Sequence, residues 1–255
     1  MLFVKTSPGN FIKEERMNYY ARHVFKLILI LFFVNGCQKV YYNTMEKLGT
    51  HKRDILASRI ENARDSQKEA KEQFNSALEQ FIVVLNVKGG ELEEKYNKIN
   101  AVYEKSVSRA EDVQHRIEQV EDVAEALFDE WKAELDEYTN SQLRRNSEKK
   151  LAATQKKYAK VIGAMKRAEK KIHPVLAAFK NQVLTLKHNL NATVIASLQS
   201  ELVTVETDVK SLIREMEGAI AEANSFLASM DNDAADKKAG LCGDVCQEIG
   251  DKITG

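Results

Sequence analysis

The chain has 255 residues, of which 44% are hydrophobic, 30% are charged and 7% are aromatic. A hydrophobic core can form at this length, but the low aromatic content and the abundance of Ala, Glu, Lys and Leu favour long helices over a compact mixed fold. Lys and Arg together number 38, as do Asp and Glu, so there is no general basic excess and we expect no nucleic-acid partner.

The N-terminal stretch has the features of a bacterial lipoprotein signal peptide. Residues 27–34, LILILFFV, form an apolar run that is too short to span a membrane comfortably, and Arg22 and Lys26 supply positive charge around its start. Gly36-Cys37 follows the run closely, as in a lipobox. The alternative is an uncleaved signal anchor followed by a free or buried cysteine.

We therefore expect residues 1–36 to be removed, Cys37 to receive lipid and residues 37–42 to form a short linker. Counted from Met17, the signal has an ordinary length, so we expect Met17 to be the true start. Gln38 follows the cysteine where an Asp would favour the inner membrane of enteric bacteria. This favours a cell-envelope location facing the periplasm, at the outer rather than the inner membrane.

The first helix of the predicted body begins near Asn43, which with Glu46 resembles a capping box, and ends at Gly89-Gly90. Its apolar residues alternate in steps of four and three, which is the seam of a coiled coil. Only Gln67 is polar among the seam residues, which are Leu56, Ile60, Ala63, Gln67, Ala70, Phe74, Ala77, Phe81 and Val84.

A second helix is predicted from Glu91 to Tyr138, about 70 Å at 1.5 Å per residue. The seam resumes out of phase at Leu151, so the region around Asn140 is either a turn or a stutter in one helix. Ser106 and Glu134 are polar members of the second seam, which comprises Leu92, Tyr96, Ile99, Tyr103, Ser106, Ala110, Val113, Ile117, Val120, Ala124, Leu127, Trp131, Glu134 and Tyr138.

His173-Pro174 predicts the boundary of the last helix, because proline fits the first turn of a helix. That helix carries a seam from Phe179 to Met230. Three polar residues near the seam, His188, Asn189 and Asn191, are interpreted as a buried polar layer that fixes register rather than as a ligand site.

Residues 231–255 are predicted to be a flexible tail, because Asp, Ala, Lys and Gly replace the apolar pattern. Cys242 and Cys246 lie in this tail. In an oxidising periplasm they could form a disulfide, or they stay free. Gly240 and Gly243 indicate that the segment is not helical.

Short turns at Gly89-Gly90 and His173-Pro174 predict that neighbouring helices run antiparallel. The predicted fold class is all-α: an elongated antiparallel coiled coil or up-down bundle of three to four long helices over residues 43–230. Three helices would leave an apolar seam exposed, which favours a homo-oligomer.

The sequence contains no phosphate-binding loop, no nucleophile elbow and no pair of Glu-x-x-His motifs. We therefore expect no enzyme activity, catalytic residue, cofactor or metal. Glu111 and His115 lie one helical turn apart, which is more often a surface contact than a metal site. Trp131 is interpreted as a core residue rather than a binding anchor.

Five stretches of the chain resemble a proteobacterial family known as domain of unknown function 2959. They are residues 41–81, GGELEEKYN at 89–97, VEDVAEALFDEW at 120–131, LRRNSEKKL at 143–151 and LKHNLNA at 186–192. The resemblance covers roughly Tyr41 to Met230. It implies a helical, lipid-anchored envelope protein and transfers no activity and no catalytic residues.

These features predict a membrane-anchored periplasmic lipoprotein whose coiled-coil body is a structural scaffold or interaction protein of the cell envelope. Lipid on Cys37 would hold it to the membrane, and the helical seams would bind a protein partner or a second copy. One alternative is a membrane-associated stress or remodelling protein. Another is a ligand- or metal-binding helical bundle.

Overall fold

The computed structural model describes residues 51–86, 92–188 and 192–253. Its contacts divide the chain into two units, Met1–Lys52 and Arg53–Gly255. The described residues form helices and turns and no strand. The helices are α2 (Lys52–Asn86), α3 (Leu92–Leu135), α4 (Ser141–His188) and α5 (Ala192–Ile253), which confirms the predicted all-α class.

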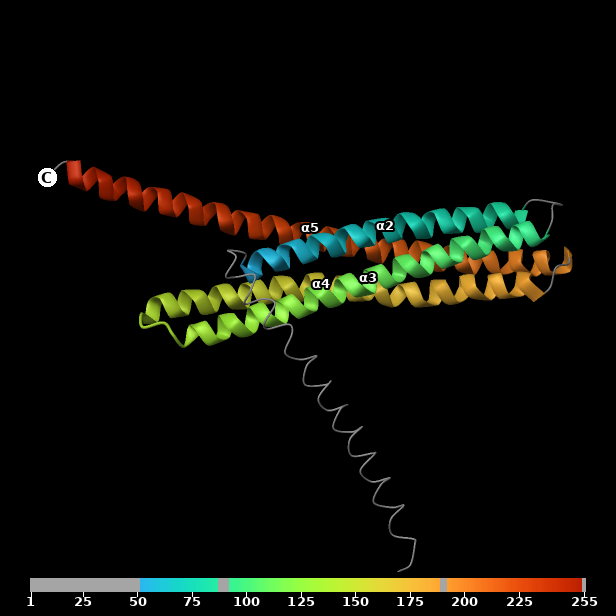
Figure 1. Ribbon diagram of the computed structural model, residues 1–255, viewed down its shortest axis with the longest axis horizontal. Coiled ribbons are helices and arrows are strands. Elements are labelled where there is room, and N and C mark those ends of the chain that lie inside the picture. Colours follow the sequence, from blue (N-terminus) through green and yellow to red (C-terminus); the bar gives the residue numbers. More distant parts are fainter. Residues whose placement is uncertain (1–50, 87–91, 189–191, 254–255) are drawn as a thin grey trace, which may run out of the picture. The chain divides into compact units, whose positions relative to one another are not determined.

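Helices that pack as neighbours run antiparallel, so the fold is an up-down four-helix bundle (Figure 1). As residue numbers rise along one helix, the numbers of the contacted residues fall along the next. The contacts that establish this order are Arg59–Gln119 and Gln73–Ser106 for α2 with α3, Glu121–Lys166 and Phe128–Tyr158 for α3 with α4, Arg167–Glu215 for α4 with α5, and Arg53–Met230 and Lys71–Glu217 for α2 with α5.

The core runs along the middle of the bundle and receives side chains from every helix. Burial of such side chains stabilises the fold by about 1.5–3 kcal/mol each. The largest of them that are fully buried are Leu56, Ile60, Phe74, Phe81 and Leu85 from α2, Ile99 and Ile117 from α3, Met165, Ile172, Phe179 and Leu186 from α4, and Leu212 from α5.

Most of the predicted seam residues whose burial is described face this core, whereas Glu134 and Tyr138 of the second seam are exposed. In α2 every predicted seam residue is buried except Val84, which is half-buried. In α5 the seam is buried at every position from Val205 to Met230. Because four seams meet within one chain, the bundle closes its own core.

The predicted helix boundary at His173-Pro174 is wrong, because α4 continues through Pro174 to His188. Proline removes a hydrogen bond to the carbonyl four residues earlier, which here belongs to Lys170. Lys170, His173 and Pro174 are all exposed, so water can bind that carbonyl and the helix can bend there without disturbing the core.

The seam explains why the helix does not end at the proline. Ile172, Val175 and Phe179 are all buried, and their spacing continues the pattern of α4 without a change of phase. The connection between α4 and α5 is at 189–191, outside the described residues. Asn189 and Asn191 are among residues 189–191, so the buried polar layer predicted for them stays a prediction.

The region around Asn140 is a turn that starts α4. The side-chain oxygen of Asn140 accepts hydrogen bonds from the backbone N–H groups of Gln142 (2.8 Å) and Leu143 (3.2 Å), which makes Asn140 the N-cap of α4. The second predicted helix is therefore shorter than expected. It ends at Leu135, and Tyr138 lies in the turn rather than in a seam.

α5 is helical to Ile253, whereas the sequence predicted a flexible tail from Asp231. Ala, Asp, Lys and Glu are compatible with a helix, and each of the three glycines that follow Asp231 in this helix, Gly240, Gly243 and Gly250, costs about 1 kcal/mol relative to alanine. The apolar pattern that stops at Met230 therefore marks the end of the seam and not the end of the helix.

Candidate functional site

Two glutamines lie in the core with their side-chain amides unpaired. Gln67 of α2 and Gln182 of α4 are 0% and 1% exposed. Neither the nitrogen nor the oxygen of either amide has a hydrogen-bond partner among the described residues. An unpaired buried amide destabilises a fold by about 1–3 kcal/mol. In coiled coils, such polar positions select one register over others.

A third buried glutamine is paired. Gln73 of α2 donates from Nε2 to the hydroxyl of Ser106 in α3, over 3.3 Å. That hydroxyl donates in turn to the backbone carbonyl of Val102, over 2.9 Å. Ser106, which the sequence identified as a polar interruption of the seam, therefore joins two helices at a defined height.

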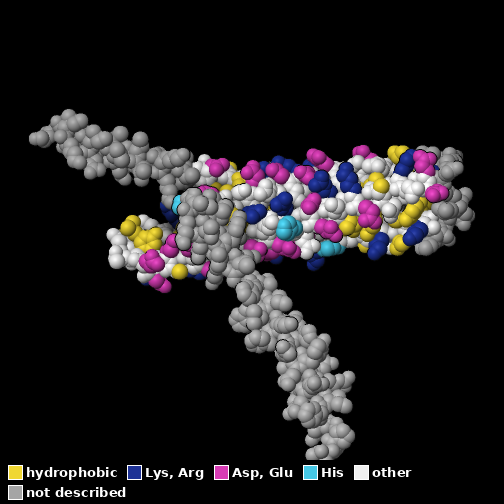
Figure 2. Space-filling model, viewed as in Figure 1, with side chains coloured by type: hydrophobic (Ala, Val, Ile, Leu, Met, Phe, Trp, Pro, Cys, Tyr) yellow, Lys and Arg dark blue, Asp and Glu magenta, His cyan; other side chains and the backbone are white. Residues whose placement is uncertain are grey.

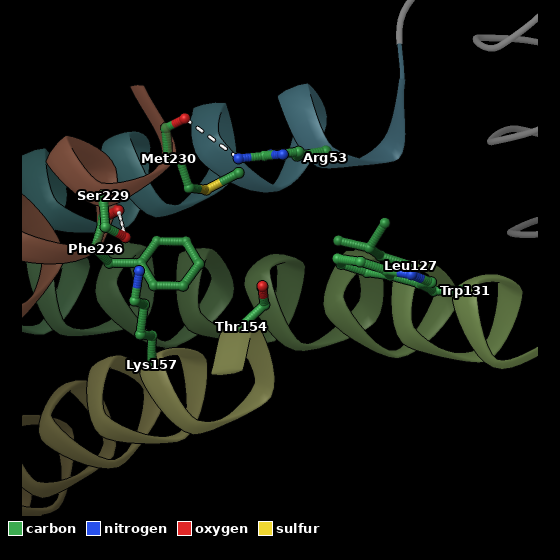
Figure 3. Close-up of a pocket in the computed structure, with 8 residues that line it drawn as sticks. All are labelled: Arg53, Leu127, Trp131, Thr154, Lys157, Phe226, Ser229 and Met230. Atoms are coloured by element: carbon green, nitrogen blue, oxygen red, sulfur yellow. Dashed lines mark hydrogen bonds between the residues drawn. The ribbon is translucent and has the colours of Figure 1, made fainter. Parts of the chain in front are cut away.

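A small hollow lies where the start of α2 meets α3, α4 and α5 (Figure 3). The Arg53 guanidinium donates to the carbonyl of Met230 beside it, over 3.3 Å. The hollow measures about 20 Å³, which is room for roughly one water molecule and far below the hundreds of Å³ of a typical ligand pocket. Its lining residues are Arg53, Leu127, Trp131, Thr154, Lys157, Phe226, Ser229 and Met230.

Trp131 lies at the edge of this hollow rather than deep in the core. It is half-buried, and its indole N–H donates to the hydroxyl of Ser147 over 2.8 Å. The prediction of a core residue is therefore correct only in part. The hydrogen bond from Trp131 to Ser147 links α3 to α4 near the turn that joins them.

The titratable groups show modest perturbations. Burial raises the pKa of Tyr158 to about 12, and the charges of Glu121 and Glu125 add to the effect. Burial also raises the pKa of Glu169. A hydrogen bond from Arg64 lowers the pKa of Asp65. None of these three groups lines the hollow described above.

Glu111 and His115 are both exposed on α3. His115 is paired with Gln119, with 2.9 Å between the His115 ring nitrogen Nε2 and the amide nitrogen. Within the described part of the chain, no three His, Cys, Asp or Glu residues are arranged to hold a metal ion. His188 is the last residue of α4.

The structure tests neither of the two predicted cysteine modifications, lipidation and a disulfide. Cys37 lies outside the described residues. Cys242 and Cys246 lie one helical turn apart in α5, although Gly240 and Gly243 had indicated a non-helical segment. The disulfide between Cys242 and Cys246, like lipidation of Cys37, stays a prediction.

The α3–α4 hairpin has a tip that the sequence did not single out. This hairpin tip, residues 132–150, is exposed at every position except Leu135 and Ser147. Tyr138 and Leu143 are 40% and 54% exposed there, and hydrophobic side chains gather at that end of the bundle in Figure 2. The signal in the sequence was the seam itself, which becomes polar at Glu134.

Elsewhere the visible surface is mixed, and hydrophobic side chains also lie exposed toward the other end of the bundle, where Val83, Leu184 and Val203 are 60%, 42% and 68% exposed. Figure 2 shows acidic and basic side chains interspersed along the bundle. Several of them pair between helices, as Arg109 does with Glu69 over 2.6 Å. Exposed pairs of this kind contribute little stability, about 0–1 kcal/mol each. None of the described helices is both long enough and apolar enough to cross a membrane.

A family model described as "Protein of unknown function (DUF2959)" matches residues 41–230. Those residues include most of the described bundle. No curated protein matches the chain.

Proposed function

Because this chain belongs to the family of proteins of unknown function called DUF2959, whose description carries no activity, we propose its function from its own residues and geometry. We propose a periplasmic lipoprotein, anchored to the membrane through Cys37, whose helical bundle is a scaffold or interaction module of the cell envelope. The outer membrane is the proposed site of the anchor, because Gln38 follows the cysteine.

The observation that carries this proposal is a closed bundle beside a lipoprotein-like signal. The four helices bury their seams against one another, so the body needs no further helix to be stable. The hollow at the start of α2 has room for about one water, and the interaction role is supported by the exposed charged faces of the bundle.

The length of the helices also suits a protein that holds its binding surface away from the membrane. α3 contains 44 residues, which corresponds to about 65 Å along the helix axis. A body of this length, tethered at one end, could present its side faces well away from the bilayer. Since the seams are occupied within the chain, we propose that a partner or second copy binds the exposed charged faces.

Site-specific crosslinking in cells tests the scaffold role. A photoreactive amino acid would replace Glu104 or Glu111, which are exposed on α3. We expect a discrete crosslinked species, either with an envelope protein or with a second copy. The same species should be lost when Cys37→Ser releases the body from the membrane.

A photoreactive residue at Val113, which is buried on the same helix, is the matched control for nonspecific capture. If no discrete species formed from any exposed face of the bundle, the scaffold role would be refuted.

A further inference from the structure

We propose that the hairpin tip, residues 132–150, inserts Tyr138 and Leu143 into the surface of the same bilayer that holds the lipid on Cys37. This inference rests on the proposed anchor and names a second membrane contact. It follows from where the chain begins its bundle, how far the tip extends and what the tip exposes.

The start of α2 and the base of the hairpin lie at one end of the bundle. Arg53, the second residue of α2, lines the same hollow as Trp131 and Thr154 (Figure 3). From Thr154 back to Ser141, α4 extends the hairpin by about 20 Å at 1.5 Å per residue. The tip therefore projects beyond the level at which α2 begins.

The tether is long enough to let the tip meet the membrane. Fifteen residue steps separate Cys37 from Lys52, and a chain of that length spans at most about 50 Å when fully extended. That limit exceeds the projection of the hairpin by more than twofold. A lipid on Cys37 and the hairpin tip can therefore contact one bilayer at the same time.

The tip exposes the side chains that suit a lipid interface. Tyr138 lies in the turn and Leu143 in the first turn of α4, and they are 40% and 54% exposed. Tyrosine places its ring at the level of lipid headgroups and keeps its hydroxyl in water. Leucine at the neighbouring position would gain by leaving water for the acyl region.

Charge contributes little to this contact. The tip contains five basic residues and four acidic residues, and Arg144 is already paired with Asp136 and Glu148. Attraction to anionic lipid would therefore be weak. Two apolar side chains bind a bilayer weakly by themselves, but a lipid anchor raises their effective concentration at the surface.

The single tryptophan of the chain allows a direct test. In a Trp131→Phe background, Leu143→Trp places the only indole at the tip. The matched control is Val83→Trp, at an equally solvated position (Val83 is 60% exposed) on the far part of α2, about 45 Å along the helix from Arg53. Full chains purified from membranes would be reconstituted in vesicles of phosphatidylcholine with brominated acyl chains, which quench tryptophan emission.

We expect the Leu143→Trp chain to lose emission and shift to shorter wavelength, and the Val83→Trp chain to do neither. Adding Tyr138→Ser to the Leu143→Trp chain should reduce the quenching. Equal quenching of both chains, or quenching of neither, would overturn the proposed contact. Circular dichroism of each variant would establish that the helices are intact.

Intact mass of the same samples separates this inference from the proposed function. Acyl mass on Cys37 without quenching at position 143 overturns the tip contact alone and leaves the anchor in place. Absence of acyl mass on Cys37 overturns the anchor and, with it, the tethered contact.

Discussion

The aromatic ring of Phe81 in α2 stacks on that of Phe179 in α4, with ring centroids 4.5 Å apart and planes 13° from parallel. Phe74 also faces Phe179, at 6.3 Å. All three rings are fully buried. This stack joins two helices that are not consecutive in the chain, and it places the residues after Pro174 in the same core as α2.

Phe179→Ala should lower the free energy of unfolding by about 3–5 kcal/mol, because it removes a buried ring from a stack and leaves a cavity. Urea denaturation followed by circular dichroism measures the change. Leu143→Ala, at an exposed position, is the control and should change stability by less than about 0.5 kcal/mol. A loss below about 1 kcal/mol for Phe179→Ala would contradict the stacked core.

Pro174→Ala should stabilise the chain, by up to about 3 kcal/mol, because it restores a backbone N–H in the interior of α4. Thermal unfolding compares it with wild type. Gly218→Ala calibrates the scale: a methyl group there meets no atom within 4 Å, so the gain should be close to about 1 kcal/mol.

A different outcome is expected if Pro174 instead begins a new helix. Proline is favoured in the first turn of a helix, so alanine would then give no gain or a loss. A neutral or destabilising result for Pro174→Ala would therefore contradict a continuous α4.

Gln67→Leu should raise the free energy of unfolding by about 1–3 kcal/mol, because a buried amide without partners is replaced by an apolar side chain of similar volume. Gln73→Leu is the paired comparison. It removes the hydrogen bond to Ser106 and should lower stability by about 0.5–1.5 kcal/mol. Denaturant titration of both variants tests the contrast, and the same sign of effect for both would refute it.

Tyr158 should ionise at a higher pH than an unperturbed tyrosine. Its pKa in the folded chain is about 12, against about 10 for an unperturbed tyrosine. The group loses its proton more easily in the unfolded chain, so the stability that it contributes is complete below pH 10 and is lost as the pH rises toward 12.

Absorbance at the phenolate band during an alkaline titration would detect this late step. Tyr158→Phe should abolish it and should reduce the loss of stability between pH 10 and pH 12. A titration of Tyr158 near pH 10 would contradict its burial against Phe128, whose ring lies 5.4 Å away.

Heptad spacing alone predicted most of the core. The seams from Leu56 to Phe81 and from Val205 to Met230 are buried as expected, because an apolar stripe along a long helix has to face other helices. The antiparallel order is also as predicted, although one of the two turns from which it was predicted, His173-Pro174, lies inside α4 and the other, Gly89-Gly90, lies outside the described residues. The spacing did not determine the number of helices, because an apolar stripe on one helix does not specify how many other helices pack against it.

One error came from the weight given to a single breaker residue. Pro174 was treated as a boundary although Ile172, Val175 and Phe179 keep one phase across it. At the hairpin, exposure of Tyr138 and Leu143 depends on where α2 and α5 stop covering α3 and α4, which is a tertiary fact.

The sequence also could not predict which buried polar side chains have hydrogen-bond partners. Gln67 and Ser106 both interrupt a seam, yet only Ser106 has a partner in a neighbouring helix. The difference depends on how α2 and α3 are aligned along their axes, because this alignment places Gln73 opposite Ser106. Spacing within one helix does not determine that alignment.

The proposed anchor is tested most directly by intact-mass analysis of the membrane fraction from cells that express wild type or Cys37→Ser. The account predicts a wild-type chain that begins at Cys37 and carries diacylglyceryl and acyl mass, and a Cys37→Ser chain that lacks this mass. A wild-type chain that retains residues before Cys37 and carries no acyl mass would contradict it.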